Sequence, residues 1–320
     1  MITLDAQQTA QALPYPELAN AIETMLTEMR SGSAHAPERL VCHVGDGDGR
    51  DGRPGGILLV MPASNRDIAM TKHVNVHAGN ARHGLPAIQG EVLVYDANNG
   101  QRLMLLDGPV LTSRRTAAVS LLAARKFAPR PRGPVLIVGA GVQARAHLEA
   151  FAAGLESRHF MLYSRTRANA RALADHAQTL GVEATVVDSV EAGLQSATVV
   201  VAATTSTTPV LPDSGAMRWR DDIFIAAVGA FRPDMQELPP QLCRDAAVRG
   251  TLVIDTWEVK HEAGDLLHAG INWSRAVPLV DAVLTPDRFR AGGPVLFKSV
   301  GCALWDLAAV LCARRLEGSS

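Results

Sequence analysis

Two glycines and an alanine, Gly139, Gly141 and Ala144, carry the clearest chemical signal in the chain. They form the pattern G-x-G-x-x-A directly after the apolar run 135–138, where a helical pattern begins. In that context the first glycine permits a tight turn, the second lets the backbone approach a pyrophosphate, and the alanine lets the helix lie close to the sheet. The N–H groups at the helix start favour an anion. We therefore expect a dinucleotide to bind here. The predicted contacts are Gly139, Gly141, Val142, Gln143 and Ala144.

The segment after the next predicted strand bears on which dinucleotide is used. An NAD-selective site normally carries an Asp or Glu there for the ribose hydroxyls. The residues found instead are Ser164, Arg165, Thr166 and Arg167. Hydroxyl and guanidinium groups suit a 2′-phosphate, because it is negatively charged and accepts paired hydrogen bonds. We expect NADPH to be preferred, with NADH still usable; alternatively, the two arginines are solvated residues at a helix start.

Apolar runs and helical stretches alternate around this motif. A helical stretch over residues 111–128 leads through the breaker segment 129–134 into the run 135–138. Further apolar runs follow at 160–163, 184–187, 198–202, 223–228 and 252–254. Uniformly apolar strands are typical of a parallel sheet covered on both faces by helices. We predict the α/β class, with a doubly wound Rossmann domain over residues 116–295.

The two ends of the 320-residue chain have a different pattern. Helical spacing over residues 16–29 is followed by short strand-like runs at 41–44, 57–61 and 68–76, with a hairpin tip expected at 46–52. The runs 91–95 and 102–106 flank an Asn-Gly turn, which predicts a hairpin. We expect the apolar helix that ends near Leu316 to return to this antiparallel sheet. The prediction is a discontinuous α/β domain over residues 1–115 and 296–320.

Basic and acidic residues are nearly balanced, at 31 against 32, which gives a formal net charge of -1. A protein without a net positive field has no general attraction for nucleic acid or an anionic membrane. Residues 1–5 lack a signal-peptide pattern, and no apolar run approaches the roughly 18 residues of a membrane span. The four cysteines are scattered without CxxC spacing, as reduced thiols are. We expect a cytoplasmic protein that binds neither nucleic acid nor membrane.

Four further stretches, taken with the glycine motif, resemble one known family over nearly the whole chain. They are Pro37-Glu38-Arg39, Met70-Thr71-Lys72, the sequence LTSRRTAA at residues 111–118, and Phe297-Lys298-Ser299-Val300-Gly301. In order and spacing they resemble the motifs of the ornithine cyclodeaminase and mu-crystallin family. The resemblance implies a cofactor domain beside a substrate domain built from both chain ends, which also makes a homodimer. It adds Thr112, Lys298 and Val300 to the predicted cofactor contacts.

The resemblance also implies the substrate site. In the family, the residues that match Arg39, Lys72 and Arg115 line the substrate pocket and hold the α-carboxylate, a role that suits planar guanidinium groups. Arg114 and Arg115 are adjacent, and the family pattern places the functional arginine immediately before Thr-Ala, hence Arg115. Taken alone, Arg39 would be interpreted as a surface ion-pair residue and Lys72 as a solvated strand residue.

The loop that begins at Val228 departs from the cyclodeaminases. Val228 follows a buried strand and is expected to line the cofactor crevice. In cyclodeaminases this loop resembles Gly-Gly-Asp, and the Asp handles the distal amine of the substrate; here Phe231 stands at that position. A benzyl side chain cannot accept a proton. Asp234 could reach back, but we prefer to interpret it as a residue at a helix start, where an acid is favoured.

These residues favour the half-reaction shared across the family, an NAD(P)H-dependent reduction of a cyclic imino acid. The expected substrates are Δ1-pyrroline-2-carboxylate and Δ1-piperideine-2-carboxylate, which would give L-proline and L-pipecolate. Lys72 and Arg115 are the predicted catalytic residues. Lys72 would assist protonation of the imine if neighbouring cations lower its pKa.

Three other functions stay open at this point. One is an ornithine cyclodeaminase that uses another base, and a second is an NAD-dependent amino acid dehydrogenase of the same family. The third is a non-catalytic protein of the crystallin type that binds NADPH and a small ligand. No metal site is predicted, because His73, His77 and His83 lie close in sequence without a carboxylate to complete a set of ligands.

Overall fold

The computed structural model describes residues 1–45, 55–213, 219–285 and 292–317. The chain divides into two compact units, Met1–Arg115 with Cys302–Ser320, and Thr116–Gly301. The first division coincides with the predicted boundary after residue 115, whereas the second follows residue 301 instead of residue 295. Residues 46–52, where we expected a hairpin tip, lie outside the described residues. Among the residues that the structure describes, no helix combines the length and the apolar character needed to cross a bilayer.

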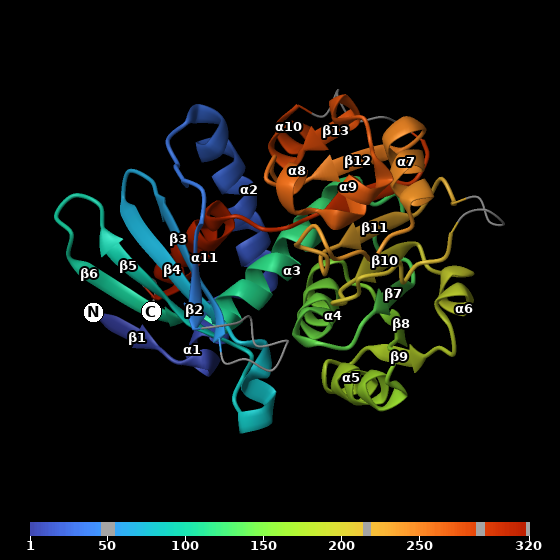
Figure 1. The fold of residues 1–320 in the computed structure, drawn as a ribbon, viewed down its shortest axis with the longest axis horizontal. Coiled ribbons are helices and arrows are strands. Elements are labelled where there is room, and N and C mark those ends of the chain that lie inside the picture. Colours follow the sequence, from blue (N-terminus) through green and yellow to red (C-terminus); the bar gives the residue numbers. More distant parts are fainter. Residues whose placement is uncertain (46–54, 214–218, 286–291, 318–320) are drawn as a thin grey trace. The chain divides into compact units, whose positions relative to one another are not determined.

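The unit Thr116–Gly301 is built on an eight-stranded parallel sheet (Figure 1). Its strands are β7 (Val135–Val138), β8 (His159–Tyr163), β9 (Glu183–Val186), β10 (Val199–Ala202), β11 (Phe224–Ala227), β12 (Thr251–Ile254), β13 (Ala276–Pro278) and β14 (Val295–Lys298). The strand order is β13-β12-β14-β11-β10-β7-β8-β9. All four residues of β7, β10, β11, β12 and β14 are buried, so both faces of the central sheet are covered, as the apolar runs predicted.

The later domain boundary has a structural cause. We expected the Rossmann domain to end at residue 295, but β14 lies between β11 and β12 and pairs with both in parallel. The short strand β13, which the sequence pattern did not indicate, completes the edge beside β12. The chain therefore leaves this unit only after the turn that follows β14, at residue 301.

Helices of this unit pack against the sheet. They are α4 (Val142–Gly154), α5 (Arg167–Thr179), α6 (Val190–Leu194), α7 (Pro240–Val248), α8 (Val259–Glu262), α9 (Gly264–Ala269) and α10 (Leu279–Leu284), with a 3-10 turn η2 (Trp273–Arg275). Residues of α6, α7 and α9 form one core cluster with the sheet. α4, which begins directly after the glycine turn, packs on β7 and β10. The order of strand, turn and helix around the motif is the one that the sequence predicts.

The unit Met1–Arg115 with Cys302–Ser320 is built on a six-stranded sheet in the order β1-β6-β5-β4-β3-β2. Its elements are β1 (Ile2–Leu4), α1 (Ala6–Gln11), α2 (Tyr15–Ser31), β2 (Leu40–Gly45), β3 (Gly55–Ser64), β4 (Ile68–Val76), η1 (Ala78–His83), β5 (Ile88–Asp96), β6 (Arg102–Asp107) and α11 (Ala303–Glu317). β2 to β6 form the expected antiparallel meander, and β1 adds in parallel to β6. α3 (Gly108–Phe127) leads from this unit into the other.

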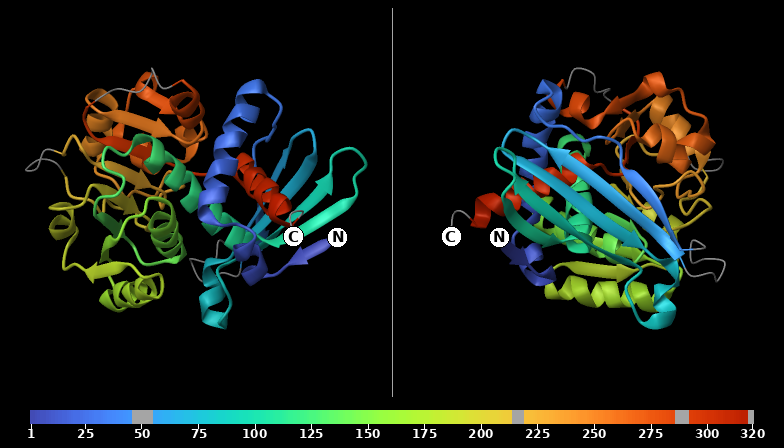
Figure 2. Two further views of the ribbon diagram at one scale, coloured as in Figure 1. Left: turned by 180° about the vertical axis from the view of Figure 1, so that it is seen from behind. Right: turned by 60° about the vertical axis from the view of Figure 1, so that its left-hand side comes forward.

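The two faces of this sheet differ. α11 contacts α2, β3 and β4, so the helices cover one face, and there Met70, Lys72 and Val74 of β4 are buried. The alternate residues Thr71 and His73 are only half-buried on the opposite face. Among the described residues no helix lies over that opposite face in the right-hand view of Figure 2. The position of Lys72 in the buried row places a cation inside this unit.

Candidate active site

The glycine turn has the geometry that a pyrophosphate cradle requires. Gly139 has a φ of 118°, and a Cβ at this position would lie 2.4 Å from the carbonyl oxygen of Ala203, so a side chain does not fit. Gly141 is the N-cap of α4, and nothing lies within 4 Å of where its Cβ would be. The N-cap has no side-chain hydrogen bond, so the first N–H groups of α4 lack a side-chain cap there. These residues fit a dinucleotide phosphate group.

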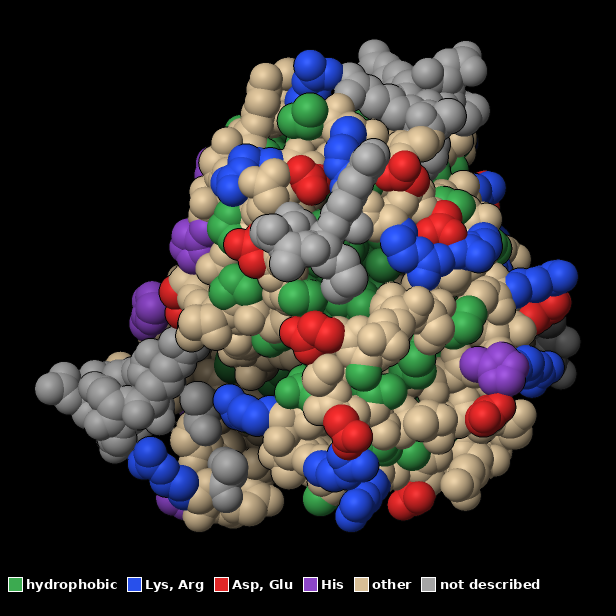
Figure 3. All heavy atoms as spheres, turned by 90° about the vertical axis from the view of Figure 1, so that its right-hand side faces the viewer, with side chains coloured by type: hydrophobic (Ala, Val, Ile, Leu, Met, Phe, Trp, Pro, Cys, Tyr) green, Lys and Arg blue, Asp and Glu red, His purple; other side chains and the backbone are tan. Residues whose placement is uncertain are grey.

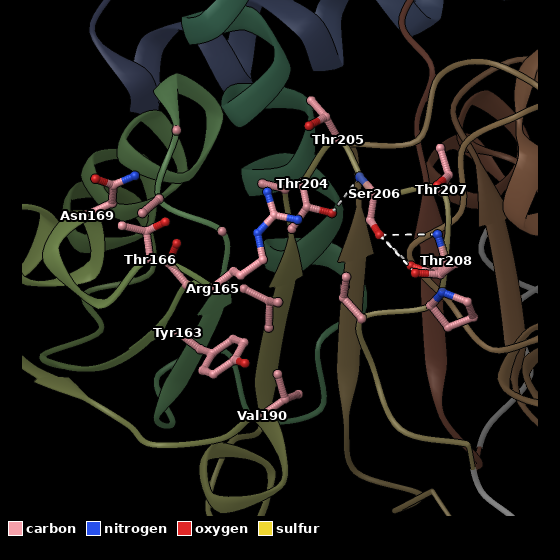
Figure 4. Close-up of a pocket in the computed structure, with 18 of the residues that line it drawn as sticks. Tyr163, Arg165, Thr166, Asn169, Val190, Thr204, Thr205, Ser206, Thr207 and Thr208 are labelled. Carbon is pink, nitrogen blue, oxygen red and sulfur yellow. Dashed lines mark hydrogen bonds between the residues drawn. The ribbon is translucent and has the colours of Figure 1, made fainter.

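A crevice of about 760 Å³ opens at this turn, at the carboxyl ends of the strands (Figure 4). One wall comes from the end of β8 and includes Arg165 and Thr166, and the other follows β10 and runs from Thr204 to Thr208. Both the size and the position are those of a cofactor site in an open parallel sheet. The crevice lies wholly in the unit Thr116–Gly301.

Five of the predicted cofactor residues line this crevice: Gly139, Gly141, Ser164, Arg165 and Thr166. Arg167, which is the first residue of α5, makes an ion pair with Asp188. The charge of Arg167 is therefore balanced within the protein, and Arg165 is the better candidate to meet a phosphate. Of the others, Val142 is exposed in the first turn of α4, Gln143 is half-buried, and Ala144 is buried against the sheet side of the helix.

The remaining predicted cofactor residues are not among the crevice lining. Val228 is buried at the end of β11, and the Val300 N–H donates to Asp255 Oδ2 at 3.1 Å. The Lys298 ammonium is fully buried and lies 2.8 Å from Asp265 Oδ2. Thr112 lies on α3 in the other unit. Contact of these four residues with a cofactor stays a prediction.

Sequence reasoning missed the second wall of the crevice. Residues 203–210 line it, and their signal was available: the polar run ATTSTTPV follows the apolar strand β10 directly. In a parallel sheet the segment after a central strand lies at the ligand-binding edge. Within this loop Ser206 Oγ donates to the Thr208 carbonyl at 2.6 Å and accepts from the Thr208 N–H at 3.2 Å.

The first unit brings Lys72 and Arg115 together on a residue that we had not predicted, Asp306. Lys72 Nζ lies 2.7 Å from Asp306 Oδ2, and Arg115 Nε donates to Asp306 Oδ1 at 2.9 Å. The Asp306 side chain is 0% exposed, and those of Lys72 and Arg115 are 2% and 7% exposed. Asp306 lies among apolar residues in the first turn of helix α11, and an acid in such a setting was a signal, because buried acids are rare unless paired.

The pKa of Lys72 is lowered from 10.5 to about 8. Burial is the largest cause, Asp306 opposes it, and the charges of Arg115 and Arg39 lower the pKa further. Our expectation that cations would lower this pKa is therefore correct in direction, but desolvation contributes more than they do. A lysine with this pKa can lose its proton near neutral pH far more readily than an exposed one.

Arg39 belongs to the same group of charges. It is half-buried, and its charge acts on the Lys72 ammonium. Lys72 and Arg115 thus share one carboxylate, Asp306, and the charge of Arg39 acts on Lys72. The bond to Asp306 uses Nε of Arg115, so its two Nη groups do not take part in that bond. A cluster with surplus positive charge is suited to an incoming carboxylate.

The loop after β11 corrects one prediction. We interpreted Asp234 as a helix start, but α7 begins at Pro240, and Asp234 lies in a turn. Asp234 instead accepts two bonds from Arg232, at 3.0 Å from Nε and 2.8 Å from Nη2. Proline at positions 239 and 240 explains the later helix, since proline favours a first helical position. Phe231 is 47% exposed in this loop.

In the part of the chain that the structure describes, no group of three His, Cys, Asp or Glu side chains is placed to hold a metal ion. The glycine turn with its crevice, in an open parallel sheet, defines a dinucleotide-binding protein of the Rossmann class. The cationic cluster in the other unit suits a small substrate with a carboxylate.

Comparison with known proteins identifies the family. Residues 2–315 match the ornithine cyclodeaminase/mu-crystallin family, and the chain belongs to it. It is 38% identical over 317 residues to Delta(1)-pyrroline-2-carboxylate reductase 1 of Burkholderia multivorans, covering 97% of this chain and 94% of that protein. It is 34% identical over 258 residues to the ketimine reductase mu-crystallin of Mus musculus, covering 79% and 78% of the two chains.

A solved structure agrees with this assignment. The Delta(1)-pyrroline-2-carboxylate reductase of Thermococcus litoralis, in complex with NADH and L-proline, is 27% identical and superposes with a TM-score of 0.87. The match covers 100% of this chain and 98% of that one. The expected two-domain α/β fold and the resemblance to the reductase branch are thereby confirmed. The chain is an imine-reducing oxidoreductase that uses a nicotinamide dinucleotide and acts on a small molecule.

Proposed function

We propose that this enzyme reduces Δ1-pyrroline-2-carboxylate, Δ1-piperideine-2-carboxylate or both to L-proline and L-pipecolate. The observation that carries the proposal is the buried cluster in which Lys72 and Arg115 share Asp306, with Arg39 close enough to act on Lys72. Such a cluster suits a substrate whose carboxylate adjoins a basic nitrogen. The names of the reductases from Burkholderia multivorans and Thermococcus litoralis support the same substrate class.

In the proposed mechanism the residues of this chain bind the substrate and deliver its proton. Arg115 and Arg39 hold the carboxylate, and this orientation supplies part of the rate. The Lys72 ammonium gives a proton to the imine nitrogen: its N–H bond breaks, an N–H bond forms on the substrate, and a neutral amine remains beside Asp306. A pKa of about 8 suits this transfer near neutral pH. The bound nicotinamide supplies the hydride.

The loop after β11 argues against the cyclodeaminase alternative. Phe231 offers no proton acceptor where cyclodeaminases carry an Asp, and the carboxylate of Asp234 is bonded to Arg232 through two hydrogen bonds. A base for the distal amine of ornithine would therefore have to come from elsewhere. Reduction of a preformed imine requires no such base.

We propose further that NADPH is preferred over NADH. Ser164, Arg165 and Thr166 line the crevice after β8, where NAD-selective sites carry an acid. Glu191 is the one acidic side chain among the lining residues, and it is exposed at the start of α6. The guanidinium of Arg165, unlike that of Arg167, is the group that would pair with a 2′-phosphate.

The first experiment measures oxidation of NADPH and NADH with Δ1-pyrroline-2-carboxylate as substrate. We expect turnover with both nucleotides and a kcat/KM about tenfold higher with NADPH, the size of effect that one charge-assisted pair provides. Incubation with ornithine is the control and should release no ammonia. Ammonia and proline from ornithine, without turnover of the imine, would show that the role given to Phe231 is wrong.

We also propose that the enzyme is a homodimer formed through the open face of the six-stranded sheet. Leu40 and Val44 on β2 are 58% and 39% exposed, and their neighbours on that face, Leu58 and Val60, are only half-buried. An exposed apolar patch of this kind, here on β2 and β3, usually marks an interface, and a symmetric interface is the commonest.

Light scattering should therefore give twice the chain mass of 34.0 kDa. Leu40→Glu places a charge on the open face and should shift the mass toward that of one chain. Val248→Glu is the matched control, because Val248 is 67% exposed at the end of α7 in the other unit. A single-chain mass for the unaltered protein would contradict this interface.

A further inference from the structure

A buried carboxylate, Glu237, joins the two loops that follow β10 and β11. Its Oε1 accepts the Thr204 N–H at 2.6 Å, and its Oε2 accepts the N–H groups of Gly229 and Ala230 at 2.7 and 3.0 Å. Thr204 lines the cofactor crevice. The loops meet so closely that a Cβ at Gly229 would lie 2.0 Å from the Thr204 carbonyl oxygen. Glu237 therefore fixes one wall of the crevice relative to the next strand.

Two further charged residues, Asp265 and Lys298, connect Glu237 to the rest of the unit through hydrogen bonds and an ion pair. Asp265 Oδ1 accepts the N–H groups of Glu237 and Leu238 at 2.6 and 2.8 Å. Asp265 Oδ2 lies 2.8 Å from Lys298 Nζ, which also donates to the Ala230 carbonyl at 2.6 Å. Lys298 comes from β14, so the chain of bonds runs from the strand beside β11 back to the loop after β11. We call Glu237, Asp265 and Lys298 the buried triad.

With Glu237 and Asp265 both ionised, the buried triad carries a net negative charge inside the protein. All three side chains are 0% exposed, and two carboxylates face one ammonium. Burial raises the pKa of Glu237, and Lys298 opposes this. Three N–H groups point at the two oxygens of Glu237, which is the arrangement that an ionised carboxylate accepts. A charge held this far from water acts strongly on neighbouring charges.

The triad lies toward one end of the crevice. The glycine turn follows β7, the residues that select the 2′-position follow β8, and the loops bonded to Glu237 follow β10 and β11 on the opposite side of β7. In open sheets of this type a dinucleotide lies across the carboxyl ends of the strands. With the adenosine end at β8, the nicotinamide end belongs on the side of β10 and β11.

We propose that Glu237 is a positioning residue for the nicotinamide end of the cofactor, and that the net charge of the buried triad favours the oxidised, cationic cofactor over the reduced one. The oxidised ring carries a positive charge that the reduced ring lacks. A fixed negative charge nearby therefore lowers the free energy of the state reached after hydride donation. The inference rests on the nicotinamide cofactor and not on which imine is reduced.

The test compares the dissociation constants of NADP⁺ and NADPH for the full chain by fluorescence titration, without substrate. Glu237→Gln removes the charge and turns an amide toward N–H donors, so both nucleotides should bind more weakly. The ratio of the NADP⁺ constant to the NADPH constant should rise by about tenfold, as the loss of one nearby charge predicts. Asp265→Asn retains an oxygen for the Glu237 N–H and should raise the same ratio.

Thr198→Val is the matched structural control. Thr198 is buried just before β10, at the opposite end of that strand, and its Oγ1 donates to the Arg130 carbonyl at 3.0 Å. Its loss should lower stability without moving the ratio. An unchanged ratio in both acidic variants, or an equal rise in Thr198→Val, would overturn the role of the charge. Unaltered binding of both nucleotides by Glu237→Gln would overturn the positioning role. If Glu237→Gln does not fold, the ratio measured for Asp265→Asn still tests the role of the charge.

Discussion

Replacing Arg115 with alanine should lower kcat/KM for Δ1-pyrroline-2-carboxylate by about a hundredfold to a thousandfold, because losing a buried charge-assisted contact costs roughly 3–4 kcal/mol. Lys72 and Asp306 remain in contact in this variant, but Asp306 Oδ1 loses its bond to Arg115. A denaturation curve recorded beside the kinetics therefore separates the lost substrate contact from lost stability. The dissociation constant of NADPH should stay unchanged, since Arg115 does not line the cofactor crevice. Steady-state kinetics at several pH values and nucleotide titration measure the two quantities.

The neighbouring arginine provides the matched control. Arg114 Nε donates to the Leu13 carbonyl at 2.8 Å, and its guanidinium stacks over the Tyr15 ring at 3.9 Å. Arg114→Ala should therefore reduce the free energy of unfolding by about 1–2 kcal/mol and leave kcat/KM nearly unchanged. If Arg114→Ala lost activity and Arg115→Ala did not, the functional arginine would have been assigned to the wrong helical position.

The contrast between these two arginines shows what a sequence can and cannot predict. The glycine turn, the strands that flank it and the hairpin at Asn99-Gly100 depend on contacts between residues close in the chain. The sequence patterns were therefore sufficient to predict these elements, and the structure confirms them. Arg115 could be separated from Arg114 only by resemblance to a family, because both lie on one helix and both have a partner in the first unit.

Asp306 could not be predicted because its partners are far away in sequence. It lies 191 residues after Arg115, and only the return of α11 to the first sheet brings them together. The position of β14 between β11 and β12 could not be predicted for the same reason, because strand order depends on contacts between residues far apart in the chain. The prediction that Asp234 begins a helix was wrong for a local reason. Its acid-rich segment resembles a helix start, but Pro239 and Pro240 place the start of α7 later in the chain.

Both units bury a cation together with carboxylates, and the two arrangements differ in net charge. In the first unit two cations, Lys72 and Arg115, are paired with the single carboxylate of Asp306, and this surplus of positive charge suits an anionic substrate. In the second, two carboxylates surround Lys298. Buried ion pairs add little to stability when compared with apolar packing, so we interpret both clusters by the charges that they hold in place. We therefore expect a second large effect at Asp306.

Asp306→Asn should destabilise the protein and move the pH dependence of the reaction. Removal of one partner of a buried pair lowers the free energy of unfolding by about 3 kcal/mol. Asp306 raises the pKa of Lys72, whereas burial and two arginines lower it to about 8. Without Asp306 this pKa must fall below about 8. The protonated lysine is present below its pKa and lost above it, so the decline of kcat/KM, expected above about pH 8 in the unaltered enzyme, should begin at lower pH in the variant.

Two comparisons isolate the effect of Asp306 on Lys72. The substrate titrates in the same way with the unaltered enzyme and with Asp306→Asn. The difference between the two pH profiles of kcat/KM therefore comes from the protein. Adding Lys72→Met to Asp306→Asn removes the unpaired ammonium, and the double variant should unfold at a denaturant concentration no lower than that of Asp306→Asn alone. If the descending limb stayed at the same pH in Asp306→Asn, Lys72 would not be the group that gives its proton to the imine.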